Sequence, residues 1–186
     1  DEFAGIQFSI GITSYTIKSN LSGSFNCTNL AAAVALGRYF DVPAPAIVQA
    51  LTDYLPAMNR VEWRKTASNQ VLLDAYNANP TSMSLSIENF AKWHKDGWLV
   101  LGDMFELGEE SAAEHRAIVK LVQRINMEER CILVGKHFGR TSWRGKQFPT
   151  TGDLKTYWRE NGAPKDAAIL LKGSRGIALE QLLPLL

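Results

Sequence analysis

The spacing of apolar residues in the first third of the chain predicts a small unit of strands followed by helices. Apolar and polar residues alternate over residues 3–18, which predicts one or two half-buried strands. Helical spacing follows over residues 26–40, and Pro43 and Pro45 are well placed to start a second helix that Pro56 ends. This second helix is predicted to carry a core-facing stripe of Ile47, Leu51, Tyr54 and Leu55.

From about residue 58 onward, short apolar runs alternate with helical patterns. Strands are predicted at residues 61–67, 71–73, 98–101, 131–134 and 168–171, and helices around 83–91, 118–125, 154–158 and 177–183. Such βα units predict an α/β fold with a Rossmann-like, mostly parallel sheet flanked by helices. The turn at Ser68-Asn69 predicts a hairpin and therefore one antiparallel strand. We place the domain boundary between residues 1–57, a small α+β unit, and residues 58–186, a complete α/β domain.

Composition and charge exclude several classes of protein. Hydrophobic residues make up 46% of the chain, and 20 basic against 19 acidic residues give a net charge of +1. The sequence contains no stripe of basic residues that would indicate a nucleic-acid partner. No apolar run reaches the roughly 18 residues of a membrane span. Residues 1–3 do not resemble a signal peptide. Cys27 and Cys131 are interpreted as small apolar side chains in a reducing compartment, and a disulfide between them is the less favoured alternative.

Polar loops follow the predicted parallel strands and are the main candidates for a binding site. Ligands of open α/β sheets bind beyond the carboxyl ends of the strands, so these loops are expected to converge on one edge. The loops are Asp74-Ala75-Tyr76-Asn77-Ala78-Asn79-Pro80, Gly102-Asp103-Met104, Gly135-Lys136-His137 and Lys172-Gly173-Ser174-Arg175.

The loop after residue 73 has two interpretations that the residues alone leave open. Asp74 is suited to accept hydrogen bonds from ribose hydroxyls, and Tyr76 to cover a flat base or sugar. Asn77 and Asn79 each offer a donor and an acceptor to a ligand with carboxylate and amide groups. Alternatively, the loop is a turn that caps the next helix, with Pro80 in the first helical turn.

Other clusters of reactive residues have simpler interpretations. The acidic residues Asp103, Glu106, Glu109, Glu110 and Glu114 are interpreted as charges around a helix start rather than as a metal site. The histidines show no zinc-binding spacing, and His115 is interpreted as a helix-surface or loop-anchoring residue rather than a base. No Gly-x-Ser-x-Gly motif indicates a nucleophilic hydrolase. We therefore predict no metal ligands and no catalytic residue in this chain.

Residues 74–83 resemble a signature of the Mur ligase family, and the Asn-Ala-Asn-Pro form resembles that of its D-alanyl-D-alanine-adding member. Residues 23–33, 101–111 and 172–176 resemble further family segments in the expected order. The resemblance implies that residues 1–57 are the end of a central ATP-binding domain and residues 58–186 the carboxyl-terminal domain. It implies a cytoplasmic, monomeric parent enzyme that uses ATP and Mg²⁺. That enzyme would join D-alanyl-D-alanine to UDP-N-acetylmuramoyl-tripeptide through an acyl phosphate.

The resemblance also implies roles for single residues. Asn26 is expected near the adenine, Arg60 at the nucleotide after domain closure, and Asp74 and Tyr76 at the ribose. The candidates for the dipeptide are Asn77, Asn79 and Ser174, with Lys172 or Arg175 for its carboxylate. Phe25 stands where the family usually has histidine, which removes a polar contact from the nucleotide pocket.

The sequence lacks a phosphate-binding loop of the form G-x-x-x-x-G-K-[ST]. The main residues for ATP and Mg²⁺ are therefore expected upstream of this chain, which by itself should bind ATP weakly and catalyse nothing. The alternative function is a non-catalytic α/β module that binds a nucleotide or a protein.

Overall fold

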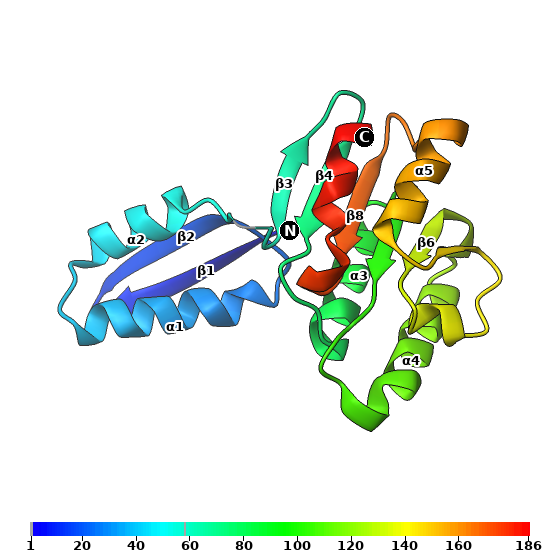
Figure 1. The fold of residues 1–186 in the computed structure, drawn as a ribbon. Coiled ribbons are helices and arrows are strands. Elements are labelled where there is room, and N and C mark those ends of the chain that lie inside the picture. The colour runs from blue at the N-terminus through cyan, green and yellow to red at the C-terminus, as the bar shows by residue number, and fades with distance from the viewer. Residues whose placement is uncertain (1, 58) are drawn as a thin grey trace. The chain divides into compact units, whose positions relative to one another are not determined.

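The chain forms two compact units, residues 1–57 and residues 58–186 (Figure 1). The computed structural model describes residues 2–57 and 59–186. Within these residues, no helix has both the length and the apolar character that crossing a bilayer requires.

The first unit is a two-stranded hairpin with two helices packed on it. Its elements are β1 (Phe3–Ile10), β2 (Thr13–Ser22), α1 (Asn26–Tyr39) and α2 (Ala44–Asp53). The strands are antiparallel and joined by a tight turn in which Gly11 has a φ of 57°. The sequence predicted one or two strands over residues 3–18, and the structure has two. The core of this unit consists of Ala4, Ile17, Leu30, Val34 and Ile47.

Tyr54 and Leu55 were predicted to face the core from the second helix, and this prediction is wrong. Helix α2 ends at Asp53, and Tyr54 has an extended ψ of 124°. Tyr54 and Leu55 are exposed. Pro56 prevents the helix from continuing, because it disfavours helical backbone at Leu55 and cannot donate the α-helical hydrogen bond to Thr52 O.

The second unit is an α/β domain with a six-stranded sheet in the order β3-β4-β8-β5-β6-β7. Its strands are β3 (Glu62–Lys65), β4 (Gln70–Asp74), β5 (Trp98–Gly102), β6 (Cys131–Val134), β7 (Lys146–Phe148) and β8 (Ala168–Lys172). Its helices are α3 (Pro80–Trp93), α4 (Ser111–Arg124) and α5 (Thr151–Asn161), with short 3₁₀ helices η1 (Gly108–Glu110), η2 (Glu128–Arg130), η3 (Phe138–Arg140), η4 (Arg175–Ile177) and η5 (Leu179–Leu185). Only β3 pairs antiparallel, with β4. The predicted fold class is confirmed.

The sheet is buried on both faces, which explains the continuous apolar runs of its strands. In β5, Leu99 and Leu101 contribute to the core beneath α3 and α4, whereas Val100 belongs to the core beneath α5 and η5. Figure 1 shows these helices on either side of the sheet of the second unit. Side chains from both faces lock the strands in register, so the loops at their ends have fixed positions.

Two elements of the second unit differ from the prediction. The edge strand β7 was not predicted, because its three residues carry no apolar run and stay largely exposed. The segment after residue 175 was predicted as a helix but forms the 3₁₀ helices η4 and η5. Ala178 lies between them in the left-handed region with a φ of 58°, and Pro184 cannot donate an α-helical hydrogen bond.

Candidate functional site

The four polar loops lie side by side at one edge of the sheet. Strands β4, β8, β5 and β6 are adjacent and parallel, so their carboxyl ends point the same way. The last residues of the strands are in register, with Asp74 beside Lys172 and Gly102 beside Val134. We call this edge, formed by residues 74–80, 102–106, 135–138 and 172–176, the carboxyl rim.

A buried ion pair joins the first and last loops of the carboxyl rim. Lys172 Nζ lies 2.5 Å from Asp74 Oδ2, and Ser86 Oγ donates to the same oxygen at 3.3 Å. Lys172 is 2% exposed, so its ammonium group is held by Asp74 rather than by solvent. Of the two cations considered for a ligand carboxylate, Arg175 therefore remains available. Asp74 Oδ1 accepts no hydrogen bond from the described residues, so the predicted ribose contact has one free acceptor.

Two arginines lie against Tyr76 in the same loop. The guanidinium carbon of Arg60 is 4.0 Å from the centre of the Tyr76 ring, and that of Arg175 is 5.6 Å away. The backbone N–H groups of Ala75 and Tyr76 both donate to Asn59 O, at 2.9 and 3.1 Å, which fixes this loop beside Arg60. In the described part of the chain neither arginine has a carboxylate partner, so the pair presents positive charge at the rim.

The asparagines of this loop use their oxygens on the backbone. Asn79 is the N-cap of α3: its Oδ1 accepts from Ser82 N at 2.8 Å, and Pro80 occupies the first helical turn. Asn77 Oδ1 accepts from Ala78 N at 2.8 Å. The capping interpretation is thus confirmed, and the predicted ligand contact stays a prediction. Among the described residues the Nδ2 groups of Asn77 and Asn79 have no acceptor, so both side chains present free amide donors.

Ser174 is buried at the start of the loop after β8. Its Oγ accepts from Phe105 N at 2.9 Å, and its own N–H donates to Asp103 O at 3.0 Å. Its hydroxyl hydrogen has no acceptor among the described residues. Ser174 can therefore donate one hydrogen bond to a ligand while it holds the neighbouring loop.

Asp103 holds the loop after β6, because its carboxylate binds the amides at the start of η3 rather than those of the helix that follows it in the sequence. Its carboxylate is 1% exposed and accepts from His137 N at 2.8 Å and from Phe138 N at 2.9 Å. Gly135 allows this approach, because a Cβ there would lie 2.1 Å from Asp103 Cγ. The remaining acidic side chains fit the earlier interpretation, since Glu109, Glu110 and Glu114 lie at the start of η1 and α4.

His115 anchors a loop and does not lie on the helix surface. It is fully buried, its Nδ1 lies 2.7 Å from Ser111 O, and its Nε2 lies 3.1 Å from Met104 N. Since Met104 N is a donor, Nε2 is unprotonated and Nδ1 carries the hydrogen, so the ring is neutral. Burial, the largest cause, lowers the pKa of His115 below its ordinary value of 6.5. No group of three or more side chains suited to a metal ion occurs among the described residues.

Asn26 lies in the first unit, at the start of α1. Its Nδ2 donates to Ser22 O at 2.8 Å, and its Oδ1 accepts from Asn29 Nδ2 at 2.9 Å. Both contacts hold the side chain at the helix start. The expected contact with adenine stays a prediction.

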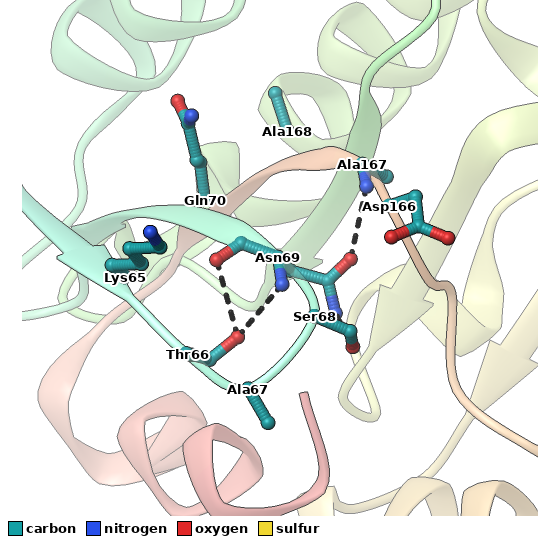
Figure 2. A pocket seen from close by; sticks show the side chains of 9 residues that line it. All are labelled: Lys65, Thr66, Ala67, Ser68, Asn69, Gln70, Asp166, Ala167 and Ala168. Carbon is teal, nitrogen blue, oxygen red and sulfur yellow. Dashed lines mark hydrogen bonds between the residues drawn. The ribbon is translucent and has the colours of Figure 1, made fainter.

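A cavity of about 470 Å³ lies at the opposite, amino edge of the sheet (Figure 2). It is lined by residues 65–70 and 166–168, from the β3–β4 turn and the start of β8. Asn69 spans this edge: its Oδ1 accepts from Ala167 N, and its Nδ2 lies within 2.9 Å of both Pro164 O and Leu186 O. Because both ends of the Asn69 amide are paired within the protein, this residue joins the β3–β4 turn to residues 164–167 and to the end of the chain.

Comparison with known proteins agrees with this architecture. Residues 59–175 match the family model "Mur ligase, glutamate ligase domain". The chain is 31% identical to UDP-N-acetylmuramoyl-tripeptide--D-alanyl-D-alanine ligase of Bacillus subtilis, with 96% of this chain and 41% of that protein covered. For the enzyme of the same name from Escherichia coli the identity is 33%, over 87% of this chain and 36% of that protein. The chain thus spans about two fifths of the length of these relatives.

The structural comparison gives the same family. The crystal structure of MurF from Acinetobacter baumannii superposes with a TM-score of 0.80 at 26% identity, covering 97% of this chain and 41% of that one. A MurF ligase from Thermotoga maritima, solved in complex with ADP, shares the fold with a TM-score of 0.74 at 20% identity, over 96% of this chain and 42% of that one. With a family model matched over more than half of its residues, the chain belongs to the Mur ligase family.

Proposed function

We propose that this chain is the carboxyl-terminal part of the ATP-dependent ligase that joins D-alanyl-D-alanine to UDP-N-acetylmuramoyl-tripeptide. The observation that carries the proposal is the set of hydrogen-bond donors left free at the carboxyl rim. Asn77 and Asn79 present unpaired amide hydrogens, Ser174 its hydroxyl hydrogen, and Arg175 its guanidinium. The names of the relatives support the same substrates.

This donor set fits the chemistry of the dipeptide. A dipeptide carries a terminal carboxylate and a peptide carbonyl, both of which are acceptors, and its amine must stay free to react. Arg175 is the residue suited to the carboxylate, because an arginine binds a carboxylate through paired N–H donors. The asparagine amides and the Ser174 hydroxyl are suited to the remaining oxygens. Fixing the dipeptide in this way orients its amine toward an activated acyl group.

The nucleotide is proposed to approach the other end of the same loop. Arg60 supplies positive charge for a phosphate, Tyr76 a flat surface, and Asp74 Oδ1 a free acceptor for a ribose hydroxyl. ATP would phosphorylate the tripeptide carboxylate, and the dipeptide amine would displace phosphate from that acyl phosphate. Stabilising the transferring phosphoryl group is mainly electrostatic. Mg²⁺ is expected with ATP, and because the described residues offer no group of three ligands for it, its ligands are proposed to lie in the rest of the enzyme.

The remaining parts of the proposal concern the whole enzyme. Residues 1–57 are proposed to be the end of its central ATP-binding domain, with Asn26 near the adenine, and residues 58–186 its carboxyl-terminal domain. We propose that the enzyme is cytoplasmic and monomeric. The phosphate-binding loop is proposed to lie in the rest of the protein, since no G-x-x-x-x-G-K-[ST] occurs in these residues.

The proposal is tested by assaying the full-length protein with ATP, Mg²⁺, UDP-N-acetylmuramoyl-tripeptide and D-alanyl-D-alanine. ADP release that depends on both other substrates, together with a product of the pentapeptide mass, is expected. The 186-residue chain alone should give no turnover. If the full-length protein binds nucleotide without forming the amide product, the chain is a binding module and the ligase proposal is wrong.

The nucleotide role of Arg60 is tested separately in the full-length enzyme. Arg60→Ala should raise the KM for ATP by about 10-fold, because one charge-assisted contact of roughly 1.5 kcal/mol is lost. The KM for the dipeptide should change less. Arg64→Ala is the matched control, since Arg64 pairs with Glu62 on the same strand, β3, and not with the rim. An unchanged ATP dependence would rule out Arg60 as a nucleotide contact.

A further inference from the structure

The loop after β5 is held at successive backbone amides by separate elements of the second unit. Asp103 N donates to Val134 O of β6 at 2.9 Å, and Met104 N to His115 Nε2 of α4 at 3.1 Å. Phe105 N donates to Ser174 Oγ, in the loop after β8, at 2.9 Å. Since each amide is paired inside the protein, these amides cannot bind a phosphate or an oxyanion. The backbone of residues 103–105 is therefore fixed by three hydrogen bonds to other elements of the second unit.

Asp103 extends these contacts to both neighbouring loops. Its carboxylate accepts from His137 N and Phe138 N, and its backbone oxygen accepts from Ser174 N at 3.0 Å. One residue therefore ties together the loops after β5, β6 and β8. The Asp103 side chain is 2% exposed, so it cannot touch a substrate itself.

We infer that Asp103 is a positioning residue of the candidate site, which sets the positions of Ser174 and Phe105 at the rim. This inference rests on the proposed function, because it assigns those two residues to the dipeptide side of the site. Ser174 offers its hydroxyl hydrogen there. The Phe105 side chain is 39% exposed, and its edge lies so close to Gly176 that a Cβ at Gly176 would be 2.7 Å away. Phe105 thus forms an apolar wall beside Ser174 and Gly176, suited to the methyl groups of alanine residues.

A carboxylate is the side chain that this arrangement requires. Two neighbouring backbone donors, His137 N and Phe138 N, each bind a different oxygen of Asp103. An asparagine has the same shape but only one acceptor oxygen. Its NH₂ group would lie opposite the N–H of either His137 or Phe138, and two donors cannot form a hydrogen bond. The space above Gly135 is filled by the carboxylate, which leaves no room for the longer glutamate side chain.

The test is Asp103→Asn in the full-length enzyme, with Asp96→Asn as the matched control. Asp96 lies just before β5, at the other end of the same strand, and pairs with Arg130 at the surface. For Asp103→Asn we expect the KM for D-alanyl-D-alanine to rise about 10-fold, because small displacements of positioning groups have large effects. The KM for ATP should stay within about 2-fold. Asp96→Asn should change neither.

Two further measurements separate positioning from a general loss of stability. Amide hydrogen exchange should become faster at His137 and Phe138, while the amides of β4 and β8 keep their protection. The KM effect of Asp103→Asn should also shrink in a Ser174→Ala background, because a shift of the loop after β5 reaches the dipeptide through Ser174, whose N–H and Oγ bind Asp103 O and Phe105 N. A rise in exchange throughout the second unit, or KM effects that simply multiply, would overturn the inference.

The inference and the proposed function fail in different ways. If the wild-type enzyme forms no pentapeptide product, the proposed function is wrong. The hold of Asp103 on the loop after β6 is then decided by the exchange experiment alone. If the enzyme is active and Asp103→Asn leaves both the dipeptide KM and the exchange of His137 and Phe138 unchanged, the inference is wrong and the proposed function stands.

Discussion

An asparagine at each edge of the sheet in the second unit differs in how far its hydrogen-bonding groups are paired within the protein. At the amino edge, Asn69 is 4% exposed. Its Oδ1 accepts from Ala167 N, and its Nδ2 donates to Pro164 O and Leu186 O. At the carboxyl rim, Asn79 is exposed. Its Oδ1 accepts from Ser82 N, and its Nδ2 has no acceptor among the described residues. A cavity is present at the amino edge, and the Asn69 side chain that lines it is paired within the protein (Figure 2). The asparagine at the carboxyl rim, unlike the one at the amino edge, therefore keeps an amide donor for a ligand.

Asp74→Ala is expected to have the largest effect on stability. The substitution leaves the buried ammonium group of Lys172 without its partner, which costs about 3–5 kcal/mol of unfolding free energy. The double variant Asp74→Ala with Lys172→Met removes both charges and should recover much of that loss. Urea unfolding of the three proteins checks this. A double variant as unstable as the single one would show that the pair is not the cause.

Asn69→Ala is expected to lower stability by about 1–3 kcal/mol, because buried backbone groups at the amino edge lose their partners. The KM values for ATP and for the dipeptide should not change, since this edge lies away from the rim. Unfolding curves and steady-state kinetics on the same preparation check both parts. A raised KM would contradict the division of roles between the two edges.

Stability is expected to fall as the pH drops below about 6.5, through the protonation of His115. Burial lowers the pKa of His115 in the folded protein, so below its ordinary value of 6.5 the unfolded chain binds more protons than the folded one. Protonation would also remove the acceptor for Met104 N. The urea midpoint of the wild type, compared with that of His115→Asn across this range, checks the prediction. An equal pH dependence in both proteins would exclude His115 as its source.

Asn79→Ser should have the smallest effect on stability and a selective effect on binding. Serine keeps an oxygen that can cap α3, so the unfolding free energy should change by less than about 0.5 kcal/mol. It removes the Nδ2 donor, so the KM for the dipeptide should rise about 5- to 10-fold, as expected for roughly 1 kcal/mol. The ATP KM should change less. Thr150→Ser, a change at the cap of α5, is the matched control.

Local residue patterns were enough to predict the fold class and the set of polar loops. The strands after residue 58 are short apolar runs, and the antiparallel strand β3 follows from the turn at Ser68-Asn69. Strand β7 was missed because its residues are largely exposed and are paired only through the backbone of β6. The cap at Asn79 was recognisable because Asn-Ala-Asn-Pro precedes a helical pattern.

The sequence by itself determined which residues stand at the ends of the strands, because apolar periodicity marks each strand and the polar residues follow directly. Only the tertiary structure decided how these residues are used. Lys172 and Asp74 are 98 positions apart and pair because β8 lies beside β4. Asp103 binds amides 34 and 35 positions away because β6 lies beside β5. Strand order brings such groups together, and local sequence does not encode which strands become neighbours.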